Sequence, residues 1–422
     1  MAIDTKLNTV ENGVSGIRDA IQNINSNMGK GHINTLDDDI EKLSNQNNFI
    51  HKVLKQAVTE TTIDPDTGEE TTEVTGYNYV NQSEYVGPNY TAIPQSKFNG
   101  NTTLSEVIIP DSVTTINRYG FQNCSNLHYI NLENIITLNG AAFTGCDLYC
   151  DINMPNLQVN YNSGGYNFRY NTNIKRVLNL GKITRFVGHP ASSFGEFLGC
   201  SSLESVVLPE TLTNLGDCTF CNCTKLKTIN FPGSITTIGR WVFRNCHELT
   251  IENLYLPNLT SIKSDSFMGI STSEKSFPNI KNITSLGSIT SLPSGDSAGG
   301  YGVFSSFTGL LSVNLHEGLA SIGTNTFCNC RSLPNITLPS TLTSIGRWAF
   351  RYCTALEYIV CLSTTPPTLY DGQVFQYDTL FTKIYVPYSE DHSILAAYQA
   401  ATNWSAHASK MIELNSDGSI PT

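Results

Sequence analysis

Three closely spaced cysteines are the first residues of this sequence that could do chemistry. Cys218, Cys221 and Cys223 read C-x-x-C-x-C, and thiolates at such spacings are typical zinc ligands. The eight histidines are scattered, with no His-x-x-x-His or Glu-x-x-His pair near these cysteines. Because Cys223 also belongs to a longer series of cysteines, we favour a structural role and expect neither a metal ion nor a cofactor.

The longer series consists of seven cysteines that recur at one position of a sequence repeat. Neighbouring members are separated by 22 or 23 residues where the repeat is regular. A free cysteine behaves as a small buried hydrophobe, so the series predicts a ladder inside the protein rather than a redox site. The seven residues are Cys124, Cys146, Cys200, Cys223, Cys246, Cys330 and Cys353.

Motifs of nucleophilic or nucleotide-dependent enzymes are absent from the sequence. It has no G-x-S-x-G elbow, phosphate-binding loop or dinucleotide fingerprint. Carboxylates that are far apart in sequence can still meet across repeats and act as a glycosidase pair. A carbohydrate-active enzyme therefore stays open as a weak alternative, and our prediction is that the protein is not an enzyme.

Arginine and tryptophan recur at matching positions of two repeats and form a candidate recognition surface. Gly239-Arg240-Trp241-Val242-Phe243-Arg244 matches Gly346-Arg347-Trp348-Ala349-Phe350-Arg351, and both phenylalanines are expected to point into the core. Tryptophan and arginine are the residues most enriched at binding hot spots, and a tryptophan face also suits a sugar ring. The alternative is that each tryptophan packs over the next repeat.

A second candidate surface is an insertion rich in Tyr, Asn, Ser and Gly. It contributes Tyr161, Tyr166, Phe168 and Tyr170. Such a composition is typical of adaptable binding loops, and a solvated loop without function is the alternative.

The elements that must position these residues are repeats of 23 residues, which begin at Leu104. Copies 203–223, 226–246 and 333–353 match at every apolar position, whereas 148–199 and 271–309 are degenerate. Apolar residues at offsets 0, 3 and 5 predict a short strand whose inner face is buried only when neighbouring repeats stack.

The repeat resembles the BspA-type leucine-rich repeat. Residues 333–353 are nearly a copy of its pattern, Leu-x-x-Ile-x-Leu-Pro-x-x-Leu-Thr-x-Ile-Gly-x-x-Ala-Phe-x-x-Cys. The resemblance implies a β-rich (α/β) leucine-rich-repeat solenoid with short parallel strands over residues 98–362. It also implies a capping segment over 363–422, with a cap helix around Tyr398–Trp404. Members of this family serve adhesion and recognition of many different targets.

The N-terminus carries a heptad pattern that predicts an α-helical coiled-coil stem over residues 1–58. Apolar residues alternate in steps of four and three, which is typical of helices that wind around one another. We expect a homo-oligomer, preferably a trimer, and the alternative is a two-helix hairpin packed on itself. A β-hairpin and linker are predicted for 59–97. The seam residues are Ile3, Leu7, Val10, Val14, Ile17, Ile21, Ile24 and Met28.

This N-terminal segment resembles the helical leader of structural proteins from tailed bacteriophages of gut bacteria. The resemblance lies in Ile17–Ile21, the Gly29-Lys30-Gly31 break and Thr35–Ile40. It implies a virion protein that is assembled in the host cytoplasm and contacts other virion proteins through its N-terminus. The polar N-terminus, without the apolar core of a secretion signal peptide, agrees with that expectation.

The overall composition excludes two classes of partner. The net charge of -11 opposes the binding of nucleic acid, and no apolar stretch approaches the roughly 18 residues that a membrane-spanning helix needs. The leading hypothesis is a non-enzymatic tail or head fibre of a phage whose repeats bind a bacterial surface glycan or protein. The main alternative is a bacterial leucine-rich-repeat protein for adhesion or protein binding that is not part of a virion.

Overall fold

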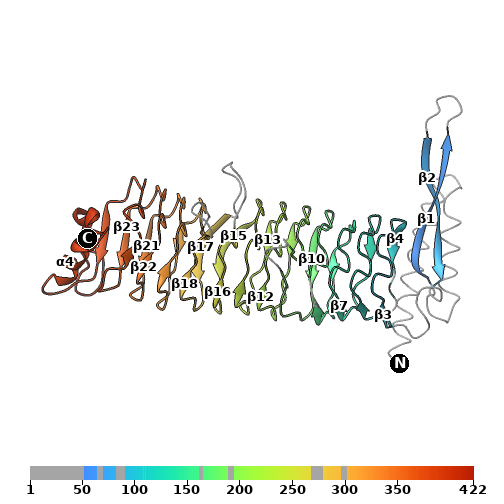
Figure 1. Cartoon of the computed structure of the whole chain (residues 1–422), viewed down its shortest axis with the longest axis horizontal. Coiled ribbons are helices and arrows are strands. Elements are labelled where there is room, and N and C mark those ends of the chain that lie inside the picture. The colour runs from blue at the N-terminus through green and yellow to red at the C-terminus, as the bar shows by residue number, and fades with distance from the viewer. Residues whose placement is uncertain are drawn as a thin grey trace, which may run out of the picture.

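The protein is a long solenoid of stacked coils, most of which contribute one strand to each of two parallel series (Figure 1). This computed structural model describes residues 52–63, 70–81, 91–107, 109, 111–160, 165–188, 194–267, 279–295 and 302–422. The predicted seam residues between Ile3 and Met28 therefore lie outside the described residues, as does Tyr161.

The first strand series comes from the apolar run that opens each repeat. Its members are β4 (Leu104–Val107), β6 (Tyr129–Ile130), β8 (Ile152–Asn153), β10 (Arg176–Asn179), β11 (Ser205–Val206), β13 (Thr228–Ile229), β15 (Thr250–Tyr255), β17 (Asn279–Ser285), β19 (Ser312–Val313), β21 (Asn335–Leu338), β23 (Tyr358–Cys361), β25 (Lys383–Val386) and β26 (Met411–Glu413). Leu203, Val206 and Leu208 are all buried, which is the predicted inner face of offsets 0, 3 and 5.

The second strand series comes from a two-residue segment in the middle of the repeat, which is Thr-Ile or Ser-Ile in five of the strands. Its members are β3 (Ala92–Ile93), β5 (Thr115–Ile116), β7 (Thr137–Leu138), β9 (Val159–Asn160), β12 (Asn214–Leu215), β14 (Thr237–Ile238), β16 (Ser261–Ile262), β18 (Ser291–Leu292), β20 (Ser321–Ile322), β22 (Ser344–Ile345) and β24 (Thr368–Leu369). Each residue pairs with its repeat equivalent, as Ile322 does with Ile345, so the sequence period sets the strand register.

A ladder of stacked phenylalanines runs through the core from the first coil to the last. Ring centroids of successive members are 5.0 to 6.1 Å apart. The members are Phe98, Phe121, Phe143, Phe168, Phe197, Phe220, Phe243, Phe267, Phe304, Phe327, Phe350 and Phe375. Phe243 and Phe350 thus point into the core, as predicted.

The seven repeat cysteines form the predicted internal ladder beside these rings. All seven are buried, and each thiol donates a hydrogen bond to the carbonyl of the ladder phenylalanine one coil earlier, as Cys223 Sγ does to Phe197 O at 3.2 Å. Burial raises the pKa of the Cys200 and Cys246 thiols, which keeps them protonated as donors. In the degenerate coil of Phe168, Asn171 takes this position and donates to Phe143 O at 2.7 Å.

In the coil of Phe375, the position that corresponds to these cysteines holds a carboxyl group, Asp378, three residues after the phenylalanine. Burial raises the pKa of Asp378 to about 8, so the folded chain holds a proton there that the unfolded chain releases near pH 4. The free energy of unfolding therefore has its full contribution from Asp378 below about pH 4. This contribution is lost as the pH rises through 8, because the folded chain must then hold a buried carboxylate.

We therefore expect Asp378→Asn to stabilise the chain by about 2 kcal/mol at pH 9 and by almost nothing at pH 4, since an amide already serves at Asn171. Thermal melts of both proteins across this pH range measure the difference. An equal difference at both ends of the range would contradict the buried, protonated state of Asp378.

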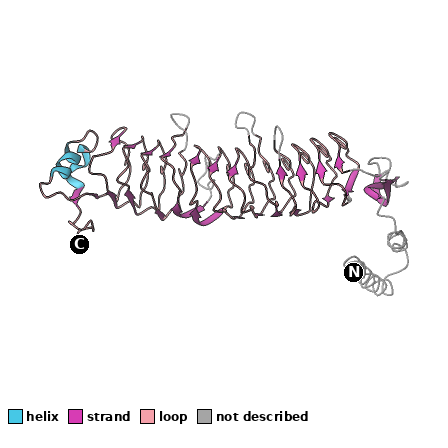
Figure 2. Cartoon of the chain, turned by 90° about the horizontal axis from the view of Figure 1, so that it is seen from below, coloured by secondary structure: helices cyan, strands magenta, loops and turns pink. Residues whose placement is uncertain are grey.

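The C-terminal segment closes the open end of the solenoid, where helix α4 (Ser393–Ala400) is followed by the 3-10 helix η2 (Ser405–Lys410) (Figure 2). Tyr398 and Trp404 are fully buried. The Tyr398 hydroxyl donates to Ser363 O at 2.8 Å and Trp404 Nε1 donates to Pro367 O at 2.6 Å. The helix ends before Trp404, and strands β24 and β25 continue both series, so coils extend past residue 362, where the sequence placed their end.

A long antiparallel hairpin, β1 (Lys52–Ile63) and β2 (Glu70–Asn81), stands across the N-terminal end (Figure 1). β1 pairs with β4, so the hairpin covers the first edge of the first strand series. The hairpin begins at residue 52, inside the range 1–58 for which the sequence predicts a helical stem. Residues 52–58 are strand because the edge of β4 supplies hydrogen-bond partners, a non-local contact that heptad spacing does not encode.

Candidate recognition surface

In each coil four positions flank the ladder phenylalanine where the chain turns after the second strand, and their exposure differs between coils. In the coil of Phe243 these are Arg240, Trp241, Arg244 and Asn245, all partly exposed, whereas Phe243 between them is buried. We call the residues at these four positions in all coils the turn face. They lie three and two residues before the ladder phenylalanine and one and two residues after it.

Two of the four turn-face positions hold a left-handed backbone. In the coil of Phe243 they are Trp241 at φ 55° and Asn245 at φ 63°. Glycine and asparagine suit such a conformation, and a bulky side chain there is a strained exception. The second left-handed position is Asn or Gly in most coils, whereas three coils place a tyrosine there, Tyr170, Tyr352 and Tyr377, at φ 61° to 69°.

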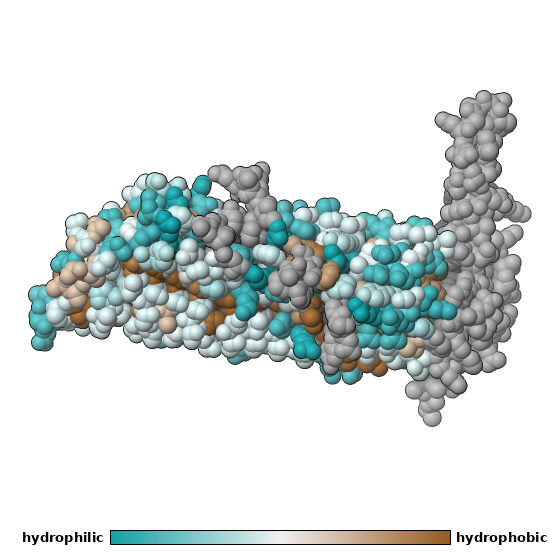
Figure 3. Space-filling view, in the orientation of Figure 1, coloured by the Kyte–Doolittle hydropathy of each residue, from teal (hydrophilic) through white to brown (hydrophobic). Residues whose placement is uncertain are grey.

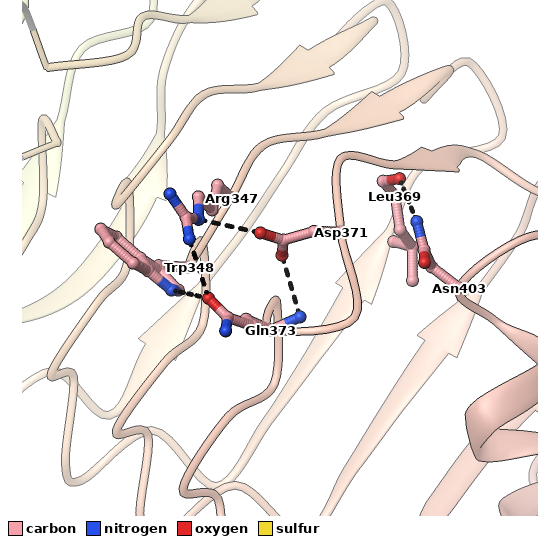
Figure 4. A network of polar contacts seen from close by, with 6 residues as sticks. All are labelled: Arg347, Trp348, Leu369, Asp371, Gln373 and Asn403. Atoms are coloured by element: carbon pink, nitrogen blue, oxygen red, sulfur yellow. Dashed lines mark hydrogen bonds and ion pairs between the residues drawn. The ribbon is translucent and has the colours of Figure 1, made fainter. Parts of the chain in front are cut away.

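The C-terminal cluster of the turn face is built around Trp348. The guanidinium groups of Arg347 and Arg351 lie 4.1 and 5.0 Å from the centroid of its ring. Trp348 Nε1 donates to Gln373 Oε1 at 2.8 Å, and Arg347 Nε lies 2.8 Å from Asp371 Oδ2 (Figure 4). Residues of the next coil therefore fix Trp348 through a hydrogen bond to its indole nitrogen and Arg347 through an ion pair.

Two exposed tyrosines extend this cluster. The rings of Tyr352 and Tyr377 are stacked, with centroids 4.7 Å apart and an interplanar angle of 11°. Arg351 lies over both rings, at 4.8 and 5.2 Å. With 39% and 51% of their surface exposed, the tyrosines present a flat aromatic platform to solvent beside a fixed guanidinium group.

The central cluster repeats the same arrangement around Trp241. Arg240 and Arg244 lie 5.5 and 5.3 Å from the centroid of its ring. Trp241 also packs on the buried residues Leu198, Cys218 and Cys221 of preceding coils. Both interpretations of these tryptophans therefore apply, because each packs on a neighbouring coil and still contributes to the surface.

The third cluster, nearer the N-terminus, is formed around Arg169. Its guanidinium group lies 4.4 Å from the centroid of Tyr170 and 4.8 Å from that of Phe194, which stacks on Tyr166. Arg169 Nη2 also donates to the Tyr170 hydroxyl at 2.9 Å, and Tyr170 is 49% exposed.

Phe168 does not belong to this surface, contrary to the prediction from the insertion. It is fully buried as a member of the phenylalanine ladder, stacked between Phe143 and Phe197. Its apolar ring fills the same core position as in every other coil, and only its neighbours Arg169 and Tyr170 face outward.

Several charges on the first strand series are paired between coils. Arg176 forms an ion pair with Asp151 and Lys281 with Glu252. Exposed apolar residues such as Val207 and Tyr255 lie on the same series, and hydrophobic residues on the visible face of Figure 3 form separate strips between hydrophilic ones.

The arginines of the turn face are arranged differently from the basic residues of the first strand series. It carries six of the ten arginines of the chain, Arg118, Arg169, Arg240, Arg244, Arg347 and Arg351. In the part of the chain that the structure describes, Arg118, Arg169, Arg244 and Arg351 form no ion pair and stack on aromatic rings instead. Stacking holds a guanidinium in place without neutralising its charge, so the turn face offers fixed positive groups to an anionic ligand.

The C-x-x-C-x-C cysteines do not converge on one site. Cys218 and Cys221 hydrogen bond to each other beneath Trp241, whereas Cys223 belongs to the main core and donates to Phe197 O. Across the described ranges, no group of three His, Cys, Asp or Glu residues is arranged to hold a metal ion.

Sequence reasoning missed Arg118, Tyr119, Phe194, Tyr352 and Tyr377. A signal for three of them was present, because Arg-Tyr pairs occur at Arg118-Tyr119 and Arg351-Tyr352 as well as in the insertion. Phe194 and Tyr377 meet their partners only across coils.

Comparison with known proteins identifies the repeat. The family model described as BspA type leucine rich repeat region matches in six copies, over residues 77–189, 193–292 and 298–396. No curated protein matches the chain. Within the described residues, no helix has both the length and the apolar character needed to cross a bilayer.

Several solved structures are similar at low identity. A leucine-rich repeat protein from Bacteroides ovatus is 20% identical, with 88% of this chain and 100% of that chain covered and a TM-score of 0.46. A leucine rich cell surface protein from Faecalibacterium prausnitzii is 18% identical, with 86% and 96% covered and a TM-score of 0.33. The pneumococcal vaccine antigen PcpA is 14% identical, with 87% and 99% covered and a TM-score of 0.39.

The coils and the cysteine and phenylalanine ladders lie within the segments that this family model matches. Its three matched segments span well over half of the sequence. The chain belongs to the BspA-type leucine-rich-repeat family.

Proposed function

We propose that this chain is a non-enzymatic bacterial leucine-rich-repeat protein that attaches to a macromolecule through its turn face. The observation that carries the proposal is the set of three arginine–aromatic clusters, which lie at matching repeat positions on one face of the solenoid. Arginine, tryptophan and tyrosine are the residues that dominate binding energy at interfaces, and solenoids use extended surfaces for recognition.

The experiment compares attachment of the full chain and of two variants to a panel of intact bacteria and immobilised surface glycans and proteins. Arg244→Gln combined with Arg351→Gln removes two stacked charges from the turn face. Arg176→Gln is the control, because this arginine is already paired with Asp151 on the first strand series. We expect the double variant to lose attachment and the control to keep it; equal attachment by all three proteins would overturn the proposal.

The phage-fibre hypothesis is the second candidate for the setting of this protein, and it depends on residues outside the described ranges. The family match covers the repeats and gives it no support, so it stays a prediction together with the homo-oligomer and the virion partners. Genes for capsid, portal or tail proteins beside this gene would favour it over the bacterial setting. Light scattering of the full chain and of a variant that lacks residues 1–50 tests the oligomer, and we expect only the full chain to exceed the monomer mass.

A further inference from the structure

One three-residue motif, Phe-Arg-Tyr, occurs in two distant coils and builds the same arrangement in both. Phe168-Arg169-Tyr170 and Phe350-Arg351-Tyr352 place the phenylalanine in the ladder, the arginine against the tyrosine ring, and the ring at the surface. The motifs are seven coils apart, which is about 34 Å at the spacing of about 4.8 Å between parallel strands. The central cluster around Trp241 lies between them on the same face.

The tyrosines of both motifs occupy a position that disfavours them. Tyr170 and Tyr352 have φ values of 62° and 61°, at the position where Asn222, Asn245 and Asn329 stand in other coils. A left-handed backbone is unfavourable for a bulky residue, and such residues cluster at functional sites. Because other coils carry asparagine here, the fold does not require tyrosine at this position.

The arginines of both motifs are fixed but not neutralised. In the described part of the chain neither forms an ion pair, and the Nε atoms of Arg169 and Arg351 are buried without a hydrogen-bond partner. Each arginine is held in place by the aromatic rings against which its guanidinium group stacks. What each motif presents is therefore an exposed aromatic ring directly beside a rigid positive charge.

We propose that the turn face binds an anionic polysaccharide. Sugar rings would lie against the exposed rings of Tyr170 and of the Tyr352–Tyr377 pair, and carboxylate or phosphate groups of the polymer would pair with Arg169 and Arg351. The inference rests on the proposed function for the location of the binding surface, and it adds the class of ligand.

Two observations favour this ligand class over others. The clusters follow one line along the solenoid, which suits an extended polymer. Each Phe-Arg-Tyr motif places an exposed tyrosine ring beside an arginine that forms no ion pair within the described residues, which suits a sugar ring that carries an anionic group. Because the net charge of -11 opposes any polyanion, binding must depend on these local contacts.

The test measures equilibrium binding of the full chain to defined polymers. Polygalacturonate and hyaluronan supply carboxylates, phosphomannan supplies phosphates on sugar rings, and fully methyl-esterified polygalacturonate is the matched neutral polymer. Poly-L-glutamate supplies charge without sugar rings. We expect at least one of the three charged carbohydrate-type polymers to bind about tenfold or more tightly than both the neutral polymer and poly-L-glutamate, with an affinity that falls as salt increases.

A double variant tests the two tyrosines at the left-handed position. Tyr170→Asn with Tyr352→Asn installs the residue that other coils carry, so this protein should fold with an unchanged or higher Tm while its affinity for the polysaccharide falls by about tenfold or more. Tyr255→Asn is the control, because Tyr255 is an exposed tyrosine on the first strand series. It should bind as the unmodified chain does.

Each other outcome overturns the ligand class. Binding to none of the charged polysaccharides, equal binding to poly-L-glutamate, or full binding by the double tyrosine variant would each contradict it. If attachment to bacteria is still lost in the arginine variant described above, the proposed function stands and only the polysaccharide inference fails. If that attachment is unaffected as well, both fail.

Discussion

Replacing Trp404 with alanine is expected to destabilise the folded chain by about 3–5 kcal/mol and to unfold the C-terminal coils first. Trp404 is fully buried, packs edge-on against Tyr398 with centroids 5.3 Å apart, and lies 6.2 Å from Phe375, the last ring of the ladder. Its removal opens a cavity under the final coil and leaves Pro367 O without the indole donor. Since each coil contacts only its neighbours, a lost cap exposes the end of the solenoid to unfolding from that side.

Denaturant unfolding measures the free energy, and hydrogen exchange shows where unfolding begins. Trp404→Phe is the matched control, because it keeps an aromatic ring and loses the hydrogen bond, for an expected cost of about 1 kcal/mol. Faster exchange spread evenly over all coils of the alanine variant, rather than concentrated in strands β22 to β26, would contradict the capping role.

Replacing Phe220 with alanine is expected to cost about 3–5 kcal/mol in the middle of the solenoid. Phe220 is fully buried and stacks between Phe197 and Phe243 at centroid distances of 5.6 and 5.7 Å. Two stacking contacts are lost together with the buried surface, and coils on both sides lose their neighbour.

Urea unfolding of the full chain measures this loss. Phe231→Ala is the control, because Phe231 is only partly buried and lies outside the ladder, 5.7 Å from Phe243 in a T-shaped contact. A loss below about 1 kcal/mol for Phe220→Ala would show that the ladder is not the main support of the core.

The regular coils could be predicted from the sequence because each buried residue recurs at a fixed offset. Val206 and Ile229 are buried or partly buried strand partners, as their shared offset requires. The insertion before Phe168 hid its place in the ladder, because its spacing from Phe143 and Phe197 departs from 23 residues. The composition of the insertion therefore suggested a binding loop, although Phe168 belongs to the core.

The candidate recognition surface could be predicted only in part, for a different physical reason. The matching Arg-Trp-x-x-Arg segments are visible in sequence, and the structure places both on the turn face. The left-handed backbone of Tyr352 and the stacking of Tyr377 on it depend on the three-dimensional path of the coil. Neither the strain nor the contact between coils leaves a local sequence pattern.

Residue-resolved hydroxyl-radical footprinting tests the recognition role of the turn face most directly. Tyr170, Tyr352 and Tyr377 are exposed on this face, while Tyr149 and Tyr255 are each 57% exposed elsewhere and serve as internal controls. All five rings should react in the free protein. When the protein is bound to the cells or polymer that retain it, the three turn-face tyrosines should be protected and the two controls should react as before. Protection of Tyr149 and Tyr255, with the turn-face tyrosines unchanged, would contradict the account.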